Sequence, residues 1–311
     1  MPPAPATLRD YLHLHFIVLL WGFTAILGKY ITIPAVELVF FRTLLAFGGL
    51  GAMLYLRRPR FRLVRVSGDV SSAVPLGEAG RLLATGALIA AHWILFFAAA
   101  RVANVSVCLA GMATSSLWTS ILEPLFNGRR IRPLEIGIGL VVMAGLYLVF
   151  HFEFNHALGG AMAVGSAMLA AMFSVLNGGF SRRHDALVIT FYEMGGAFAA
   201  TALFLPFYAA WLVPDGTLRL VPTGLDWLLI AGLAFVCTVY AYSAAVQLLR
   251  RFSVFAMNLV INLEPVYGIV LAFLILGESE RMTPGFYLGT LVILVAVLSY
   301  PVLDRRMVKG E

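Results

Sequence analysis

Several ionisable and amide side chains lie inside long apolar stretches of this sequence. They are Arg42, His92, Glu193, Asn258, Asn262 and Glu264. A charged side chain in the middle of a lipid bilayer costs about 2.5–3.5 kcal/mol, so such residues normally face a partner or a water-filled cavity. Guanidinium and carboxylate groups bind charged solutes, and carboxylates and imidazoles also exchange protons. The pattern favours binding of a polar solute, with Glu193, Glu264 and His92 as candidates for proton coupling.

Arg42 and Glu193 are expected at matching depths in two different helices. Each lies about seven residues from the end of its apolar stretch, which is about 10 Å at 1.5 Å per residue. Small residues follow each of them at helical spacing and leave space for a cavity or for close packing. We assign both residues to a gate or a substrate contact. The alternative is a structural ion pair, or side chains that reach toward the lipid headgroups.

The apolar stretch 254–276 combines two amides, a carboxylate and a proline. Pro265 cannot donate a backbone hydrogen bond, so we expect a helix break there. Asn258 and Asn262 lie four residues apart on one helical face, and we assign them to substrate contact. Glu264 points about 200° away from Asn262. For Glu264 proton binding, bracing of a neighbouring helix and a structural hydrogen bond all stay open.

Aromatic residues accompany the histidine. His92 and Trp93 lie in the middle of one apolar stretch, and Tyr240, with Tyr242 two residues further on, lies near the equivalent depth in another. The rings are candidates for stacking on an organic solute or cation. The alternatives are a neutral histidine bonded between helices and aromatic residues that only pack. We place His92, Trp93 and Tyr240 in the expected cavity, and we expect no metal ion and no cofactor.

These residues belong to a chain of 311 residues with the composition of a membrane protein. Apolar residues make up 61% of it and charged residues only 12%, about half the share of a soluble domain. A soluble fold has no means of hiding so much apolar surface, which argues against soluble enzymes, nucleic-acid-binding proteins and disordered proteins. The net charge of +6 fits basic loops at a membrane better than a nucleic-acid partner.

Apolar stretches long enough to cross a bilayer divide the chain. We expect ten membrane-spanning helices in the lipid bilayer, with no attached soluble domain. They cover about 11–29, 35–56, 81–100, 104–126, 134–151, 158–179, 187–212, 226–248, 254–276 and 283–303. Of the 22 Lys and Arg residues, 17 fall in connections on the side of the N-terminus and four on the other side. The positive-inside rule therefore places residues 1–10 and 304–311 in the cytoplasm and the protein in the cytoplasmic (inner) membrane.

The two halves of the chain, 11–151 and 152–303, resemble each other at a shift near 150 residues. The clearest matches are Phe23–Gly28 with Phe173–Gly178 and Phe41-Arg42 with Tyr192-Glu193. Because each half holds five spans, the second half must enter the membrane from the opposite side. The sequence therefore predicts an all-α membrane protein of two inverted five-helix repeats, an architecture that suits alternating access to a central site.

Short motifs in both halves are similar to those of a known family. They are Trp21-Gly22-Phe23-Thr24, Phe40-Phe41-Arg42, His92-Trp93, Asn104-Val105-Ser106-Val107, Glu264-Pro265 and Gly277-Glu278. With these motifs the chain resembles the drug/metabolite transporter superfamily, in its EamA-like branch, over nearly its whole length. The resemblance implies a ten-span fold and export of amino acids or related metabolites. The family usually has a proline within its fourth span, where this chain has Ser115-Ser116.

We therefore expect a secondary active or facilitative transporter and not an enzyme. Its substrate would be a small organic metabolite, an amino acid or a related amphiphilic solute, moved by alternating access in the export direction. No Walker A motif occurs, so this chain does not use ATP in that way. The alternative is a flippase for lipids or lipid precursors, and a remote alternative is an intramembrane enzyme. The expected partners are a small-molecule substrate and the lipid bilayer, with no nucleic acid, and the protein is a monomer or a homodimer.

Overall fold

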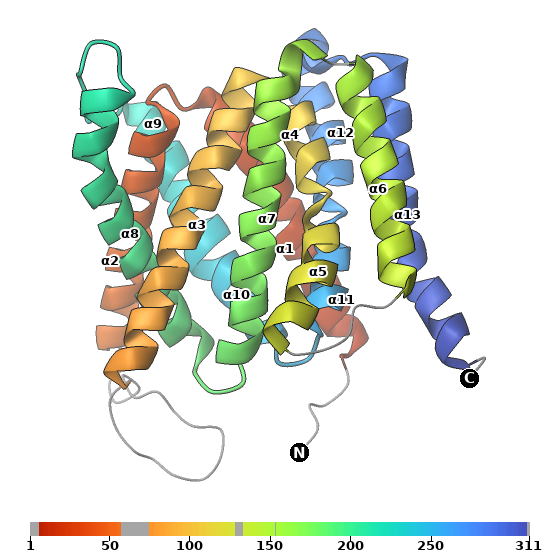
Figure 1. Ribbon diagram of the computed structural model, residues 1–311. Coiled ribbons are helices and arrows are strands. Elements are labelled where there is room, and N and C mark those ends of the chain that lie inside the picture. Colours follow the sequence, from red (N-terminus) through yellow and green to blue (C-terminus); the bar gives the residue numbers. More distant parts are fainter. Residues whose placement is uncertain (1–5, 57–74, 128–132, 153, 310–311) are drawn as a thin grey trace.

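The computed structural model describes residues 6–56, 75–127, 133–152 and 154–309. These residues form a helical bundle, and no strand occurs among them (Figure 1). The elements are α1 (Leu8–Tyr30), α2 (Ala35–Leu56), α3 (Leu76–Val102), α4 (Val105–Met112), α5 (Ser115–Asn127), α6 (Pro133–Phe152), η1 (Phe154–His156), α7 (Ala157–Phe180), α8 (Ala186–Trp211), α9 (Gly224–Ala231), η2 (Gly232–Tyr240), α10 (Ala241–Leu248), α11 (Val254–Ile261), α12 (Glu264–Leu276), η3 (Gly277–Glu280) and α13 (Pro284–Lys309). The all-helical fold confirms the prediction from the sequence. Much of the basic connection after α2, and residues 129–132, lie outside the described residues.

Within the described residues, eight segments are long and apolar enough to cross a bilayer. They are α1, α2, α3, α4 with α5, α7, α8, α9 through α10, and α11 with α12. α6 and α13 contain shorter apolar helices, at Gly137–Val149 and Pro284–Ala296. The prediction of membrane-spanning helices is thus confirmed for eight segments, and a total of ten stays a prediction.

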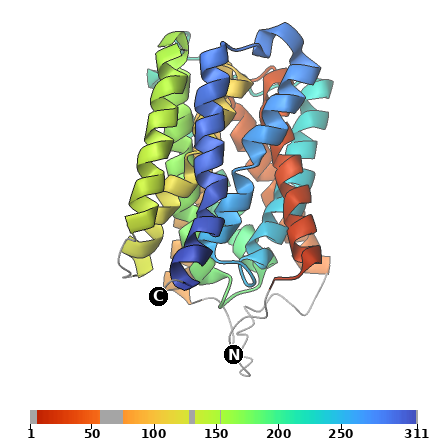
Figure 2. The same cartoon turned by 90° about the vertical axis from the view of Figure 1, so that its right-hand side faces the viewer.

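The two halves of the chain enter the bundle from opposite ends. α1 begins at the end of the bundle where α13 finishes, whereas α7 begins at the other end (Figures 1 and 2). We call the end that holds the start of α1 the terminal end, and the opposite end the distal end. Arg250 and Arg251 follow α10 at the terminal end, and Arg219 and Arg281 lie in connections at the distal end.

Two helical passes are interrupted within the bundle. In the second half α11 ends at Ile261 and α12 begins at Glu264, with Pro265 in its first turn. In the first half α4 ends at Met112 and α5 begins at Ser115, although no proline is present there. The part of the chain that the structure describes therefore contains a discontinuous helix of this kind in each half.

Two hydrogen bonds of Thr114 accompany the helix break in the first half. The backbone N–H of Thr114 donates to the carbonyl of Gly111 at 3.1 Å, and its hydroxyl donates to the same oxygen at 2.8 Å. Both bonds close a tighter turn than the α-helical one and compete with the regular ladder. Such a local bond leaves no proline signal in the sequence.

The halves meet most closely where α3 packs against α8. A Cβ atom added to Gly86 would clash with the carbonyl oxygen of Glu193, and one added to Gly196 would clash with the carbonyl of Leu83. Glycine at both positions lets the two backbones touch. This contact ties the first half to the second beside Glu193.

Alanine substitution should separate the two kinds of glycine in α3. Gly80 has open space around the position of a Cβ atom, whereas Gly86 does not. Gly80→Ala should raise thermal stability slightly, because alanine favours a helix by about 0.5–1 kcal/mol. Gly86→Ala should lower it by about 1–3 kcal/mol, because the extra methyl group forces the backbones apart. Thermal unfolding of the two variants in detergent measures both changes, and equal effects of the same sign would contradict the close contact.

Candidate functional site

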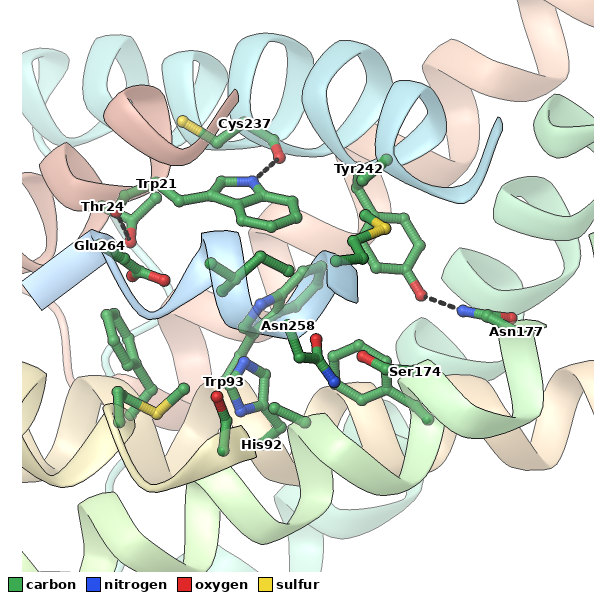
Figure 3. Close-up of a pocket in the computed structure, with 18 of the residues that line it drawn as sticks. Trp21, Thr24, His92, Trp93, Ser174, Asn177, Cys237, Tyr242, Asn258 and Glu264 are labelled. Carbon is green, nitrogen blue, oxygen red and sulfur yellow. Dashed lines mark hydrogen bonds between the residues drawn. The ribbon is translucent and has the colours of Figure 1, made fainter. Parts of the chain in front are cut away.

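An internal cavity lies beside the two helix breaks, between the halves (Figure 3). About 90 Å³ of it is open to the centres of water-sized molecules, and about 10–15 Å³ on this measure holds one water. The wall combines the aromatic residues Trp21, Trp93, Phe96, Phe173 and Tyr242 with the polar residues Thr24, Arg42, His92, Ser115, Ser174, Asn177, Asn258 and Glu264. The cavity has room for several waters or a small solute.

Equivalent positions of the two halves line the cavity in pairs. Thr24 with Ser174 and His92 with Tyr242 are 150 residues apart, and Met112 with Ile261 and Ser115 with Glu264 are 149 residues apart. This spacing is the repeat shift found in the sequence. The cavity therefore forms where the two repeats face each other.

Arg42 reaches the cavity from α2 and is 2% exposed. Its Nε donates to Thr238 Oγ1 at 3.0 Å, and its guanidinium carbon lies 3.8 Å from the centre of the Trp93 ring. A guanidinium over an aromatic face is held by a cation–π interaction. No ion pair to a carboxylate holds it among the described residues, so the rest of the guanidinium can bind an anionic group in the cavity.

Thr238 holds Arg42 from a segment of unusual geometry. η2 is a nine-residue π-helix within the pass formed by α9 and α10. The hydroxyl of Thr238 donates to the carbonyl of Leu233, five residues back, at 2.9 Å. The hydroxyl is thereby fixed as an acceptor for Arg42.

His92 is anchored by one side of its ring. Nδ1 lies 2.7 Å from Ser166 Oγ and 2.9 Å from the Ser166 carbonyl, while Ser166 Oγ donates to the carbonyl of His92 at 2.9 Å. Because the hydroxyl proton is used on that carbonyl, we assign the ring proton to Nδ1. In this assignment Nε2 is the acceptor nitrogen of a neutral ring.

Asn258, within α11, and Asn262, directly after it, lie in different surroundings. Asn258 lines the cavity, and its Nδ2 donates to Thr119 Oγ1 at 2.7 Å. Asn262 is not on the cavity wall, because it follows the end of α11 and accepts a hydrogen bond from Ser115 Oγ at 3.0 Å. Asn262 therefore connects the two helix breaks, which corrects its expected place in the cavity.

Glu264 is the carboxylate on the cavity wall. It is 6% exposed and opens the first turn of α12, close to Trp21 and Thr24 (Figure 3). The positive end of a helix dipole favours a negative charge at this position. No hydrogen bond to its side chain occurs in the part of the chain that the structure describes, so the carboxylate is directed at whatever fills the cavity.

Glu193 lies behind the wall and is fully buried. Its Oε2 accepts a hydrogen bond from the Tyr242 hydroxyl at 3.0 Å, and Asn177 Nδ2 donates to the same hydroxyl at 2.7 Å. Tyr242 and Asn177 line the cavity and separate Glu193 from it. The structure thus corrects the direct solute contact expected for Glu193.

Tyr240 also differs from expectation. Its side chain is 44% exposed, its hydroxyl lies 3.0 Å from His13 Nε2, and it does not line the cavity. Tyr242 occupies the place expected for Tyr240. Trp21 and Asn177 are further wall residues that the sequence motifs did not assign to the cavity, and a strict shift of 150 residues from His92 was the signal that favoured Tyr242 over Tyr240.

The distal end is closed by buried carboxylates that bridge the halves. Asp226 accepts hydrogen bonds from the backbone N–H and the hydroxyl of Thr32, both at 2.7 Å. Glu280 accepts two bonds from Ser106, at 2.9 and 3.0 Å, and one from the backbone of Val105 at 3.2 Å. Asp226 and Glu280 are at most 1% exposed. The distal end is therefore sealed by charge-assisted bonds to backbone groups of the other half.

The terminal end is closed by longer, more exposed side chains. Arg251 pairs with Asp10 at 2.8 Å, and His184 Nε2 lies 2.7 Å from a carboxylate oxygen of Glu78. Burial lowers the pKa of His184, and the neighbouring Glu78 opposes this shift. The cavity wall reaches Leu249, two residues before Arg251. The cavity thus approaches the terminal end, where the closing contacts are weaker.

Comparison with known proteins identifies the fold. The model of the EamA-like transporter family matches residues 11–151 and 157–300, one copy in each half. The chain belongs to this family. One solved crystal structure is 18% identical with a TM-score of 0.66, and the match covers 96% of this chain and 99% of that one, which shows a shared fold. A search of curated proteins gave no match. This EamA-like protein is therefore a member of a family of membrane transporters.

Cys237 allows the distal seal to be tested. It lines the cavity, whereas Cys108, the other cysteine of the chain, is fully buried away from it. Asp226→Asn removes an acceptor for Thr32, so a membrane-impermeant maleimide added at the distal side should label Cys237 several-fold faster.

The matched control is Asp215→Asn, since Asp215 lies in an exposed connection and bonds only to Thr217 among the described residues. Labelling is measured by mass spectrometry in sealed vesicles of both orientations, on a Cys108→Ser background. Equal rates for the two variants would show that Asp226 does not seal the cavity.

Proposed function

We propose that this protein moves a small zwitterionic metabolite, an amino acid or a related solute, across the cytoplasmic membrane by alternating access. The observation that carries the proposal is the cavity wall. It presents a cation, Arg42, and a carboxylate, Glu264, neither of them in an ion pair with a described residue. A solute with one negative and one positive group would satisfy both charges at once.

The rest of the wall supports the same chemistry. Arg42 offers guanidinium N–H groups to a carboxylate, and Glu264 offers oxygens to an ammonium group. His92 adds an acceptor nitrogen for a further N–H, and the rings of Trp21 and Phe96 suit an apolar portion of the solute. A purely apolar ligand would leave the two charges unpaired at a cost of several kcal/mol.

The architecture supports alternating access. The cavity lies between two repeats that enter the bundle from opposite ends, so rocking of one half against the other would expose it at either end. The distal end is sealed by buried carboxylates, and the wall approaches the terminal end. With the basic connections of the terminal end in the cytoplasm, this state would load solute from the cytoplasm, in agreement with export.

Thermal unfolding with added ligands tests the proposal. Purified protein in detergent is heated with amino acids, amines, nucleobases or lipids at pH 6 and pH 8. A ligand at 100 times its dissociation constant adds about 2.7 kcal/mol to the folded state. An amino acid should raise the midpoint of unfolding, and Arg42→Gln or Glu264→Gln should abolish this rise.

The matched control is Glu278→Gln, since the Glu278 side chain is 78% exposed and lies in η3. It should keep the full ligand effect. A rise with lipids alone would favour the flippase, and a rise with amino acids that survives both cavity substitutions would place the site elsewhere.

A further inference from the structure

We propose that Glu193 is the protonation site that couples this transporter to a proton gradient, and that Tyr242 connects it to the cavity. The inference rests on the proposed function and adds the coupling ion to it. It gives the two carboxylates different roles: Glu264 binds the solute, and Glu193 binds the proton.

The first argument is the lack of a cation beside a fully buried carboxylate. Glu193 is 0% exposed, and its Oε1 has no hydrogen-bond partner among the described residues. Its Oε2 accepts a hydrogen bond from the hydroxyl of Tyr242, and the neutral side-chain amide of Asn177 also lies beside the carboxylate. Removing a bare carboxylate from water costs several kcal/mol, so the group requires a cation, and a proton needs the least space. The free oxygen is where that proton can reside.

The second argument concerns the other ionisable groups near α8. The elements that pack closely against it are α2, α3 and α10, and η2 directly precedes α10. Their ionisable side chains within the described residues are Glu37, Arg42 and Tyr55 on α2, Glu78, Arg81, His92 and Arg101 on α3, Cys237 and Tyr240 on η2, and Tyr242 on α10. Arg42 is turned to Thr238 and Trp93, and His92 is turned to Ser166. Tyr242 is the group from this set that hydrogen-bonds to Glu193.

The third argument is the route. Tyr242 lines the cavity and donates its hydroxyl proton toward Glu193, while Asn177, which also lines the cavity, donates to the hydroxyl oxygen (Figure 3). The hydroxyl can pass its proton to Glu193 Oε2 and take one from a water in the cavity. The tyrosine ends unchanged, the carboxylate gains one proton, and the water loses one.

The position of Glu193 explains how its charge would affect the halves. Its backbone carbonyl lies against Gly86, at the close contact between α3 and α8. A neutral side chain is compatible with this close contact between the halves. A charged one favours hydration, and therefore separation of the halves. Binding and release of one proton would then bias the two states of the transporter.

Infrared difference spectra test the site without any ligand. Spectra of the wild-type protein at stepped pH should contain the C=O band of a protonated carboxyl group that disappears in Glu193→Gln. After transfer to deuterated water, this band should shift quickly in the wild type and much more slowly in Tyr242→Phe. Tyr240→Phe is the matched control and should exchange like the wild type. If Glu193→Gln retains every carboxyl band of the wild type, Glu193 is not the protonation site. If the band exchanges as quickly in Tyr242→Phe as in the wild type, Tyr242 is not the route.

Labelling of Cys237 tests the coupling, again without ligand. The rate at which N-ethylmaleimide labels Cys237 is measured against pH in the wild type and in Glu193→Gln. Glutamine stays neutral at every pH, so the ratio of the two rates should change several-fold with pH. A ratio that stays constant with pH would overturn the coupling. Thermal stabilisation by amino acids is a separate readout, so failure of the proposed function and failure of this inference are distinguishable.

Discussion

The arrangement of polar groups in this bundle follows from the cost of burying a polar group without a partner. Most interior polar side chains satisfy the requirement inside the protein. Arg42 bonds Thr238, and Asn258 bonds Thr119. Glu264 meets it differently, by facing a cavity. Glu264 at the cavity and Oε1 of Glu193 behind it are thus left without a protein partner among the described residues, and both proposals above rest on them.

The two ends of the bundle are held by interactions of different strength. At the distal end Asp226 and Glu280 accept backbone hydrogen bonds while fully or almost fully buried. Hydrogen bonds to charged groups contribute about 1.5–3 kcal/mol each. At the terminal end the pair of Arg251 with Asp10 involves an arginine side chain that is 48% exposed, and such pairs contribute about 0–1 kcal/mol. Breaking the contacts of Asp226 and Glu280 at the distal end therefore costs more free energy than breaking the pair of Arg251 with Asp10 at the terminal end.

Composition, charge and the repeat shift were sufficient to predict an all-helical membrane protein of two repeats, because the bilayer imposes length and polarity on each helix. The same signals predicted that Arg42, His92 and Asn258 would lie at a cavity between the halves. They did not resolve which way a side chain points around its own helix. Asn262 follows the end of α11 and bonds to Ser115 instead of lining the cavity, and Glu193 lies behind Tyr242. Both placements depend on helix distortion and packing, which the residue types alone do not predict.

The number of residues in the π-helix η2 affects how the side chains of the cavity wall are held. A π-helix accommodates an additional residue within an α-helical pass. Because this segment absorbs the extra residue locally, deleting one residue between Gly232 and Tyr240 would restore an ordinary α-helical pass and leave Tyr242 facing the cavity. The deletion would instead remove the wide turn in which the Thr238 hydroxyl bonds to Leu233, five residues back, and accepts from Arg42. A family member with a one-residue gap here would therefore keep its wall residues and hold its cavity arginine differently.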